Sequence, residues 1–292
     1  MEHKSKGPGK LVTFLIQAAV LIILVVVGGI FVLRPGEDKP QETTETTTAP
    51  TQQTTQPATQ ESTAPVSLLP TNPYGKNDFQ YYGDYLTCLT GESIMGIDVS
   101  RYQGDIDWEA VRDAGVEFAI IRVGGRSYSG AGEIYEDVNA DKNYAGARAA
   151  GIKVGVYFFA QAINVTEARE EAEYVLNAIR DWELDMPVVY DWEHVSSRAR
   201  TADMDITTLT NCTKEFCRLV EEAGYEAMVY FNPTHSEKRV DLEQLMDYKF
   251  WLAMYSDRMT YPYKVDMWQY TDQGTIPGIE GFVDINLYFP YE

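Results

Sequence analysis

The chain has 292 residues, of which 45% are hydrophobic, and carries a formal net charge of −20 at pH 7. Such a charge argues against a nucleic-acid partner, because phosphate binding requires a basic surface. Three cysteines are too few for the disulfide scaffold of an exported domain. Cys212 and Cys217 lie too far apart on a predicted helix to pair, and nothing assigns Cys88 to either, so we expect buried free thiols.

Residues 11–33 form an apolar run without a charged residue. As a helix this run would extend roughly 35 Å, enough to cross the hydrocarbon core of a bilayer, which is about 30 Å thick. It is longer than the apolar core of a cleaved signal peptide, so we predict an uncleaved transmembrane anchor. Lys4, Lys6 and Lys10 precede it, which predicts that residues 1–10 form a cytoplasmic tail and that the rest lies outside the cell.

Residues 34–65 contain no Val, Ile, Leu, Met or aromatic residue, and ten threonines fall between Thr43 and Thr63. A segment of this composition cannot bury enough apolar surface to offset the entropy cost of ordering, so we predict a disordered linker. Residues 66–93 are rich in tyrosine and are interpreted as an aromatic lead-in that wraps the following domain. The globular domain itself is expected over 94–292.

Strand and helix patterns alternate from residue 94 onward. Predicted strands over 94–99, 118–123, 153–159, 187–190 and 228–231 are separated by helices that begin at 107, 139, 166 and 206. Three further strands, over 250–255, 265–270 and 281–285, follow with little helix between them. Repeated βα units of this number predict an α/β protein with a parallel barrel of the (β/α)8 type whose last helices are eroded.

Acidic residues lie where several of these strands end, which is where such barrels carry their catalytic groups. Asp191 and Glu193 follow the fourth strand two positions apart, so their side chains should point to the same face. Two carboxylates held this close push their proton affinities apart, which suits one to act as a general acid. Asp98 and Asp284 end two other strands and are the remaining catalytic candidates.

Aromatic and amide side chains cluster at the same level of the predicted barrel. Acids combined with aromatic rings are typical of a saccharide cleft, because rings stack on sugar faces while acids act on hydroxyls and the glycosidic oxygen. Any one of these rings alone is more often part of a core. The substrate-binding candidates are Tyr157, Tyr230, Trp251, Tyr255, Trp268 and Gln269.

Six sequence blocks occur in the order found in one known family. Gly96-Ile-Asp-Val-Ser100, followed by Gln103-Gly and Ile106-Asp-Trp108, resembles the opening of glycoside hydrolase family 25, the muramidases. The resemblance runs from about Ile94 to the C-terminus. The later blocks are Gly155-Val-Tyr-Phe-Phe159, Pro187-Val-Val-Tyr-Asp-Trp-Glu193, Phe250-Trp-Leu-Ala-Met-Tyr255, Met267-Trp-Gln-Tyr270 and Val283-Asp-Ile-Asn286.

The resemblance implies a (β/α)5(β)3 barrel that cleaves, with retention, the β-1,4 bond between N-acetylmuramic acid and N-acetylglucosamine. It implies that Glu193 is the general acid and that Asp191 orients the substrate N-acetyl group, whose oxygen attacks the anomeric carbon. The other implied roles are saccharide binding by Asp98 and Asp284 and lining of the groove by Tyr157 and Trp268. One departure is the segment 230–235, which lacks a second aromatic residue expected there.

These expectations describe an enzyme without a cofactor that acts on peptidoglycan glycan strands from a single-pass anchor in the cell membrane, with no obligate protein partner. A Gram-positive wall fits such a tether. Two alternatives stay open: a non-hydrolytic wall-binding module, and a glycosidase for another N-acetylated polymer such as chitin. His194 and His235 are a weak signal for a metal, since they lack helical i, i+4 spacing. The glycosylation patterns at Asn164 and Asn211 are treated as incidental.

Overall fold

The computed structural model describes residues 67–291. The predicted cytoplasmic tail (1–10), membrane span (11–33) and linker (34–65) all lie outside the described residues. Across 67–291, none of the helices combines the length and the apolar character needed to cross a membrane.

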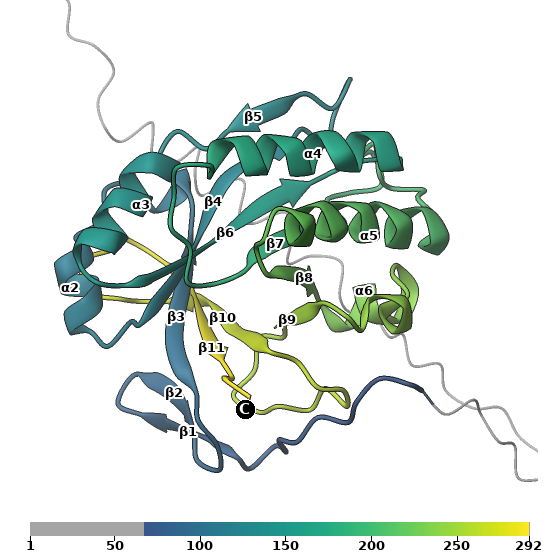
Figure 1. The fold of residues 1–292 in the computed structure, drawn as a ribbon. Coiled ribbons are helices and arrows are strands. Elements are labelled where there is room, and N and C mark those ends of the chain that lie inside the picture. Colours follow the sequence, from purple (N-terminus) through teal and green to yellow (C-terminus); the bar gives the residue numbers. More distant parts are fainter. Residues whose placement is uncertain (1–66, 292) are drawn as a thin grey trace, which may run out of the picture. The chain divides into compact units, whose positions relative to one another are not determined.

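Eight strands close into a barrel at the centre of the domain (Figure 1). Neighbours pair around the ring, and the first barrel strand pairs with both the second and the last, which closes it. The predicted barrel is therefore confirmed. In chain order the barrel strands are β3 (Ile94–Val99), β4 (Phe118–Arg126), β6 (Lys153–Ala160), β7 (Val188–Trp192), β8 (Ala227–Phe231), β9 (Lys249–Ala253), β10 (Met267–Gly274) and β11 (Val283–Tyr288).

A helix follows each of the first five barrel strands, and none follows the last three, so the implied (β/α)5(β)3 arrangement is observed. Figure 1 shows α4 and α5 side by side on the outside of the barrel. Two short 3-10 helices, η1 (Arg101–Gln103) and η2 (Leu242–Leu245), complete the connections. The five helices are α2 (Trp108–Asp113), α3 (Ala140–Ala149), α4 (Val165–Ala178), α5 (Ile206–Glu222) and α6 (Pro233–Lys238).

Polar side chains begin the longer helices where the sequence predicted. Asn164 caps α4 by accepting a hydrogen bond from the backbone N–H of Glu167, and Asp205 caps α5 through Thr208. Such caps satisfy N–H groups that have no partner within the helix. Gly224 follows α5 with a φ of 90°, a conformation that glycine adopts without a steric penalty.

The eighth strand is the main correction to the predicted topology. β11 runs antiparallel to both of its neighbours, β10 and β3. A parallel return requires a crossover of a dozen or more residues, and only residues 275–282 separate β10 from β11. The start of β11 therefore lies at the barrel end where the parallel strands finish, and Asp284 is directly opposite Asp98 in register.

Two hydrophobic layers hold the barrel together. The larger layer packs the outer faces of the strands against the helices. The smaller one fills the barrel interior with Phe118, Ile120, Met186, Val189, Met228, Trp251 and Met267. Gly96 in β3 faces this interior, and the Phe118 ring occupies the space where a Cβ at position 96 would lie.

The aromatic lead-in contains a hairpin that was not predicted, and its Phe79 ring packs against Trp268 of the barrel. Strands β1 (Phe79–Tyr82) and β2 (Tyr85–Cys88) pair antiparallel, and their Phe79 and Leu86 side chains are buried. The short strand β5 (Ile134–Glu136), which pairs with the end of β4, was also missed. All three cysteines are buried free thiols, as predicted.

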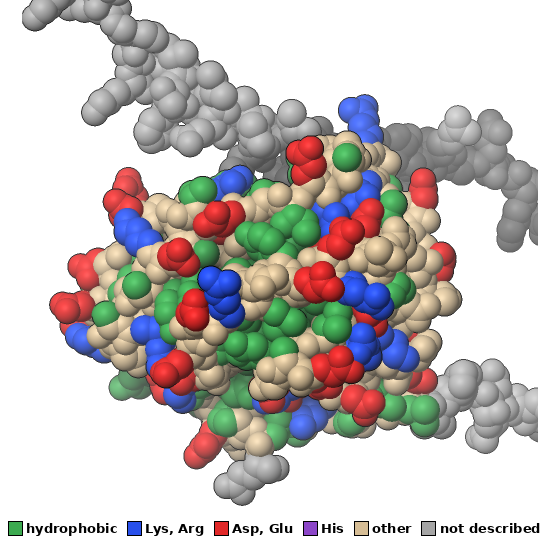
Figure 2. Space-filling view, turned by 45° about the horizontal axis from the view of Figure 1, so that its top comes forward, with side chains coloured by type: hydrophobic (Ala, Val, Ile, Leu, Met, Phe, Trp, Pro, Cys, Tyr) green, Lys and Arg blue, Asp and Glu red, His purple; other side chains and the backbone are tan. Residues whose placement is uncertain are grey.

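Acidic and basic side chains are mixed over the face seen in Figure 2. On α4 and α5, Arg169 pairs with Glu215 at 2.7 Å, and Arg218 pairs with Glu222 at 2.5 Å. Each pair has an arginine that is about half exposed, and ion pairs at the surface contribute little to stability. This face thus carries side chains of both signs rather than a patch of one sign.

Candidate active site

A cavity of about 140 Å³ opens at the barrel end where the parallel strands finish. All four predicted acids and five of the six predicted substrate-binding residues line it. We call this cavity the acidic pocket. Its lining residues are Asp98, Tyr157, Asp191, Glu193, Tyr230, Trp251, Tyr255, Gln269 and Asp284.

Trp268 does not reach the acidic pocket, so its predicted place in the groove is wrong. Its indole has no exposed surface; it lies 5.0 Å from the Phe79 ring and donates a hydrogen bond to the backbone oxygen of Met254. Side chains alternate along a strand, and Gln269 already faces the pocket, so Trp268 must face outward against the hairpin. The period-two rule applied to β10 could have separated the two residues.

Asp98 is held by two side-chain amides. Its Oδ2 accepts hydrogen bonds from Gln269 Nε2 at 2.8 Å and from Asn286 Nδ2 at 2.9 Å. Asn286 is itself oriented by Trp251, whose Nε1 donates to Asn286 Oδ1 at 2.9 Å. Burial raises the pKa of Asp98 to about 6, although both amide hydrogen bonds oppose the rise. Asn286 belongs to this site and was not among the predicted residues.

Two tyrosines determine which way the Gln269 amide points. The hydroxyls of Tyr230 and Tyr255 donate to Gln269 Oε1 at 3.0 and 3.2 Å, which leaves its NH2 group to Asp98. Tyr230 also packs edge-on against Trp251, with 4.9 Å between the ring centroids. Burial raises the pKa of Tyr230 and Tyr255, so both stay neutral hydroxyls. These rings and hydroxyls form one wall of the pocket.

Asp191 and Glu193 lie at the end of β7, on the same side of the strand as predicted. Burial raises the pKa of Asp191 well above its usual range, and the charge of Glu193 adds to the rise. Burial, followed by the charge of Asp98, also raises the pKa of Glu193, while a hydrogen bond with Asp191 opposes the increase. Within residues 67–291, Asp191 Oδ1 is buried and has no hydrogen-bond partner.

Asp284 completes the set. Burial, followed by the charge of Asp98, raises its pKa to about 9. Burial raises the pKa of all four carboxyl groups, and the charge of Asp98 adds to the rise in the other three, so they cannot all be ionised at neutral pH. The pocket therefore retains protons near pH 7, which is the condition for general acid catalysis.

Arg122 provides a positive charge next to the acidic pocket and was not predicted. It lies beside Tyr157 in the register of β4 and β6, and its charge opposes the rise in the pKa of Asp191. Its Nε and Nη2 both lie 2.7 Å from Oδ2 of the fully buried Asp137. An arginine within an apolar strand gives no signal in the sequence that it faces a site.

Gln161, between β6 and α4, holds the backbone of the predicted general acid. Its Nε2 donates to the carbonyl oxygen of Glu193 at 3.0 Å, and its Oε1 accepts from the Thr201 hydroxyl at 2.7 Å. Its own backbone N–H donates to Glu171 on α4 at 3.0 Å. Only the tertiary structure brings these segments together, so sequence reasoning missed Gln161.

His235 packs inside the domain, whereas His194 is exposed. His235 is buried, its ring lies 5.2 Å from that of Trp192, and burial lowers its pKa to about 4. Across 67–291, no group of three or more His, Cys, Asp or Glu side chains is arranged to hold a metal ion.

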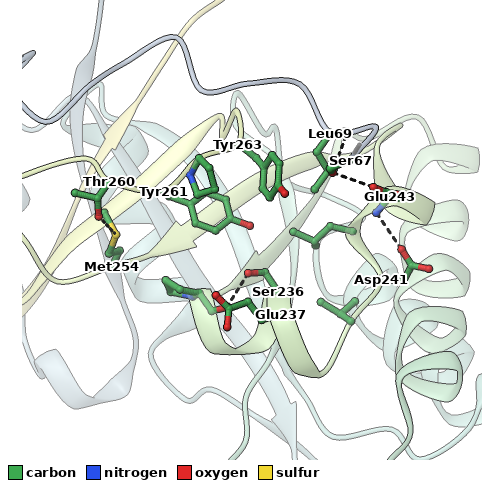
Figure 3. A pocket seen from close by; sticks show the side chains of 14 residues that line it. Ser67, Leu69, Ser236, Glu237, Asp241, Glu243, Met254, Thr260, Tyr261 and Tyr263 are labelled. Carbon is green, nitrogen blue, oxygen red and sulfur yellow. Dashed lines mark hydrogen bonds between the residues drawn. The ribbon is translucent and has the colours of Figure 1, made fainter. Parts of the chain in front are cut away.

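A larger cavity, of about 630 Å³, lies between α6, η2 and the loop after β9 (Figure 3). Figure 3 shows Tyr261 and Tyr263 on one side of it and Ser236 and Glu237 on another. None of the four acids of the acidic pocket lines this cavity. Size therefore does not identify the reacting site; the convergence of buried acids does.

A family model and two curated relatives match this chain over similar parts of its length. The family model of Glycosyl hydrolases family 25 matches residues 97–279. Lysozyme M1 of Streptomyces globisporus is 29% identical over 205 residues, which cover 67% of this chain and 67% of that protein. The autolytic lysozyme of Clostridium acetobutylicum is 27% identical over 194 residues, covering 66% of this chain and 55% of that protein.

Solved structures show the same fold. The modular autolysin LytC of Streptococcus pneumoniae superposes with a TM-score of 0.59 at 27% identity, covering 68% of this chain and 47% of LytC. The lysozyme of Streptomyces coelicolor superposes with a TM-score of 0.55 at 26% identity, covering 70% of this chain and 94% of that chain. The chain thus spans only about half of the clostridial and pneumococcal relatives. Because the family model covers more than half of this chain, the protein belongs to glycosyl hydrolases family 25 and is a glycoside hydrolase.

Proposed function

We propose that this protein is a membrane-tethered N-acetylmuramidase that cleaves the β-1,4 bond between N-acetylmuramic acid and N-acetylglucosamine in peptidoglycan. The observation that carries the proposal is the acidic pocket, where Glu193 has a raised pKa and lies near the buried Asp98 and Asp191 and the partly buried Asp284. The relatives add support: two are called lysozymes, and one structure of LytC is described as a complex with a synthetic peptidoglycan ligand.

In the proposed reaction Glu193 gives its proton to the glycosidic oxygen as the bond to the anomeric carbon breaks. The acetamido oxygen of the same sugar attacks the anomeric carbon, and Asp191 orients and stabilises the acetamido N–H. Water then opens the cyclic intermediate, with Glu193 taking a proton from it, so the anomeric configuration is retained. The position of Asp191 in the lining of the acidic pocket, two residues from Glu193, supports this role.

The pocket walls support saccharide binding. Tyr230 and Tyr255 supply ring surfaces, and Asp98 and Asp284 supply acceptors for hydroxyls. A cavity of about 140 Å³ is smaller than the roughly 300–1,000 Å³ of most ligand pockets. It fits the reacting part of a long polymer better than an entire small ligand.

The anchor predicted over 11–33 and the linker predicted over 34–65 would place this domain outside the cell and away from the bilayer, suited to remodelling the cell's own wall. Membrane fractionation of the full chain and of a chain that begins at Val66 tests the anchor. Only the full chain should sediment with membranes, and equal solubility of the two would remove this part of the proposal.

Digestion of purified peptidoglycan with the fragment from Val66, followed by mass spectrometry of the new reducing ends, tests the activity. N-acetylmuramic acid at those ends is the expected result. N-acetylglucosamine there would assign the other glycosidic bond. Binding without new reducing ends would favour the wall-binding module, and cleavage of chitin oligomers alone would favour a chitin glycosidase.

A further inference from the structure

A basic and aromatic surface borders the acidic pocket beside β3, β4 and β5. It consists of Arg101, Tyr102, Arg122 and Tyr135, and we call it the Arg101 rim. Arg101 and Tyr102 belong to η1, which directly follows the strand that carries Asp98. This position places the rim at the same end of the barrel as the four acids.

Within the rim, the Arg101 guanidinium lies close to two tyrosine rings. Its guanidinium carbon lies 5.2 Å from the Tyr102 ring centroid and 5.8 Å from that of Tyr135. Its Nη2 donates to the Tyr102 hydroxyl at 3.4 Å, which leaves the O–H of Tyr102 free to donate elsewhere. Across 67–291 the Arg101 guanidinium forms no ion pair with a carboxylate, and Tyr102 is 72% exposed. A guanidinium stacked in this way is preoriented for an incoming anion.

The second arginine of the rim is already neutralised. Arg122 lies 5.0 Å from the Tyr102 ring, but it is buried and paired with Asp137. Asp137 also accepts from the backbone N–H of Arg101 at 3.0 Å, which fixes the start of η1. The pair thus supports the rim and leaves Arg101 as its available charge.

The rim is continuous with the acidic pocket. Arg122 is the register partner of Tyr157, which lines the pocket. Burial raises the pKa of Tyr135, Arg122 and Arg101 oppose this rise, and Asp191 adds to it. The charges of both rim arginines and of an acid in the pocket therefore all act on Tyr135.

We propose that Arg101, together with the hydroxyl of Tyr102, binds a carboxylate carried by the glycan beside the cleaved bond. The acids of the pocket that are ionised repel a substrate anion, whereas the positive charge of Arg101 attracts one. The ligand class is an acidic N-acetylated saccharide, which a neutral N-acetylglucosamine polymer is not. This inference rests on the proposed function, because it assigns the substrate charge that the same site accepts.

The test compares the full-length wild-type chain with Arg101→Gln on one glycan in two forms. One form is peptide-free wall glycan with its lactyl carboxylates, and the other is the same glycan with those carboxylates amidated. KM for the charged form should rise about fivefold in the variant, with kcat unchanged, as expected for an exposed charge pair worth about 1 kcal/mol. KM for the amidated form should not change. Arg180→Gln, which removes an exposed arginine that follows α4, is the matched control.

Two further arms sharpen the result. Intact peptidoglycan separates the sources of the carboxylate, because the stem peptide is joined to the lactyl group through an amide. An effect of Arg101→Gln that disappears on intact peptidoglycan assigns the lactyl carboxylate, and one that persists there assigns a carboxylate of the stem peptide. Raising the ionic strength should reduce the difference between wild type and Arg101→Gln on the charged glycan, because salt screens an exposed pair. Arg101→Lys, which keeps the charge but loses the planar fork, should recover part of the loss.

Equal KM increases on charged and amidated glycan would overturn the proposal, because they would indicate lost packing rather than lost charge. Unchanged KM on both forms would overturn it as well. Failure of the muramidase assignment is distinguishable by calorimetry with peptide-free glycan. If wild type cleaves nothing, tighter binding of the charged form by wild type than by Arg101→Gln still supports the carboxylate site, and equal binding rejects it.

Discussion

Two of the places where the domain holds acidic side chains away from bulk solvent are built differently. In the acidic pocket, Asp98, Asp191, Glu193 and Asp284 face a cavity, and the side-chain donors to Asp98 are neutral amides. The second place, which we call the Glu171 cluster, consists of Arg126, Glu167, Glu171 and Arg200. There Arg126 pairs with Glu171 at 2.9 Å, and Arg200 pairs with Glu167 at 2.7 Å.

A raised pKa does not distinguish the acids of the acidic pocket from Glu171 in the Glu171 cluster. Burial raises the pKa of Glu171 to about 7 despite the opposing charge of Arg126, and burial is also the largest cause in the acidic pocket. What differs is access and pairing: Glu171 is fully buried beside a cation, whereas the pocket acids face open space. We conclude that an acid is a candidate for proton transfer when it combines a raised pKa with a cavity and with no partner cation in contact.

Glu193→Gln should separate chemistry from folding most strongly. Glutamine keeps the shape of the side chain but cannot donate a proton, so kcat should fall at least about 10³-fold, within the range of general acid catalysis. Release of reducing ends from peptidoglycan measures this loss. The thermal unfolding midpoint should change little, and undiminished cleavage would falsify the role of Glu193.

Arg126→Met should have the opposite profile, with a large loss of stability. It leaves Glu171 buried without its cation, which should lower the free energy of unfolding by about 3–5 kcal/mol at pH 7. Urea denaturation followed by circular dichroism measures the change. Adding Glu171→Gln to this variant should recover part of the loss, and Arg180→Met, at an exposed arginine, is the control. A neutral effect of Arg126→Met would mean that the Glu171 cluster does not stabilise the fold.

Asp284→Asn should stabilise the protein at alkaline pH. The pKa of Asp284 is raised to about 9, so the folded chain holds a proton that the unfolded chain releases above about pH 4. The resulting cost to folding is absent below about pH 4 and grows as pH rises toward 9. The variant should therefore gain about 1–3 kcal/mol at pH 8 and nothing at pH 4. Thermal melts at both pH values test this, and a gain at pH 4 would point to altered packing instead.

Gln161→Leu should have the smallest effect on activity. Gln161 lies between the acidic pocket and the Glu171 cluster and forms hydrogen bonds with a residue of each. The side chain of Gln161 donates a hydrogen bond to the backbone carbonyl of Glu193, and its backbone N–H donates one to the Glu171 carboxylate. Loss of the bond to the Glu193 carbonyl should displace the general acid and lower kcat about tenfold with little change in KM. Because the alkaline limb of the pH–rate profile reports the pKa of the general acid, displacement of Glu193 should also shift that limb. Thr201→Val, which removes only the hydroxyl that supports Gln161 Oε1, is the control and should cost less.

The amino-acid sequence by itself determined the series of βα units, because hydrophobic periodicity, N-caps and stop glycines are local signals. It also placed Asp98, Asp191 and Glu193 together, since strand ends converge in any such barrel. Asp284 was placed in the pocket although the direction of its strand was predicted wrongly. The predicted strand, 281–285, ended just after Asp284, whereas β11 runs antiparallel and begins beside it, so both descriptions put Asp284 at the same barrel end.

Only the tertiary structure decided which way individual side chains turn and which distant segments meet. Trp268 packs outward on Phe79 because a hairpin that precedes the barrel by sequence covers that face of β10. Asn286, Arg122 and Gln161 reach the site through contacts between strands and loops far apart in the chain. Local patterns carry information over about one helical turn or strand, whereas these contacts depend on barrel closure, which no local pattern encodes.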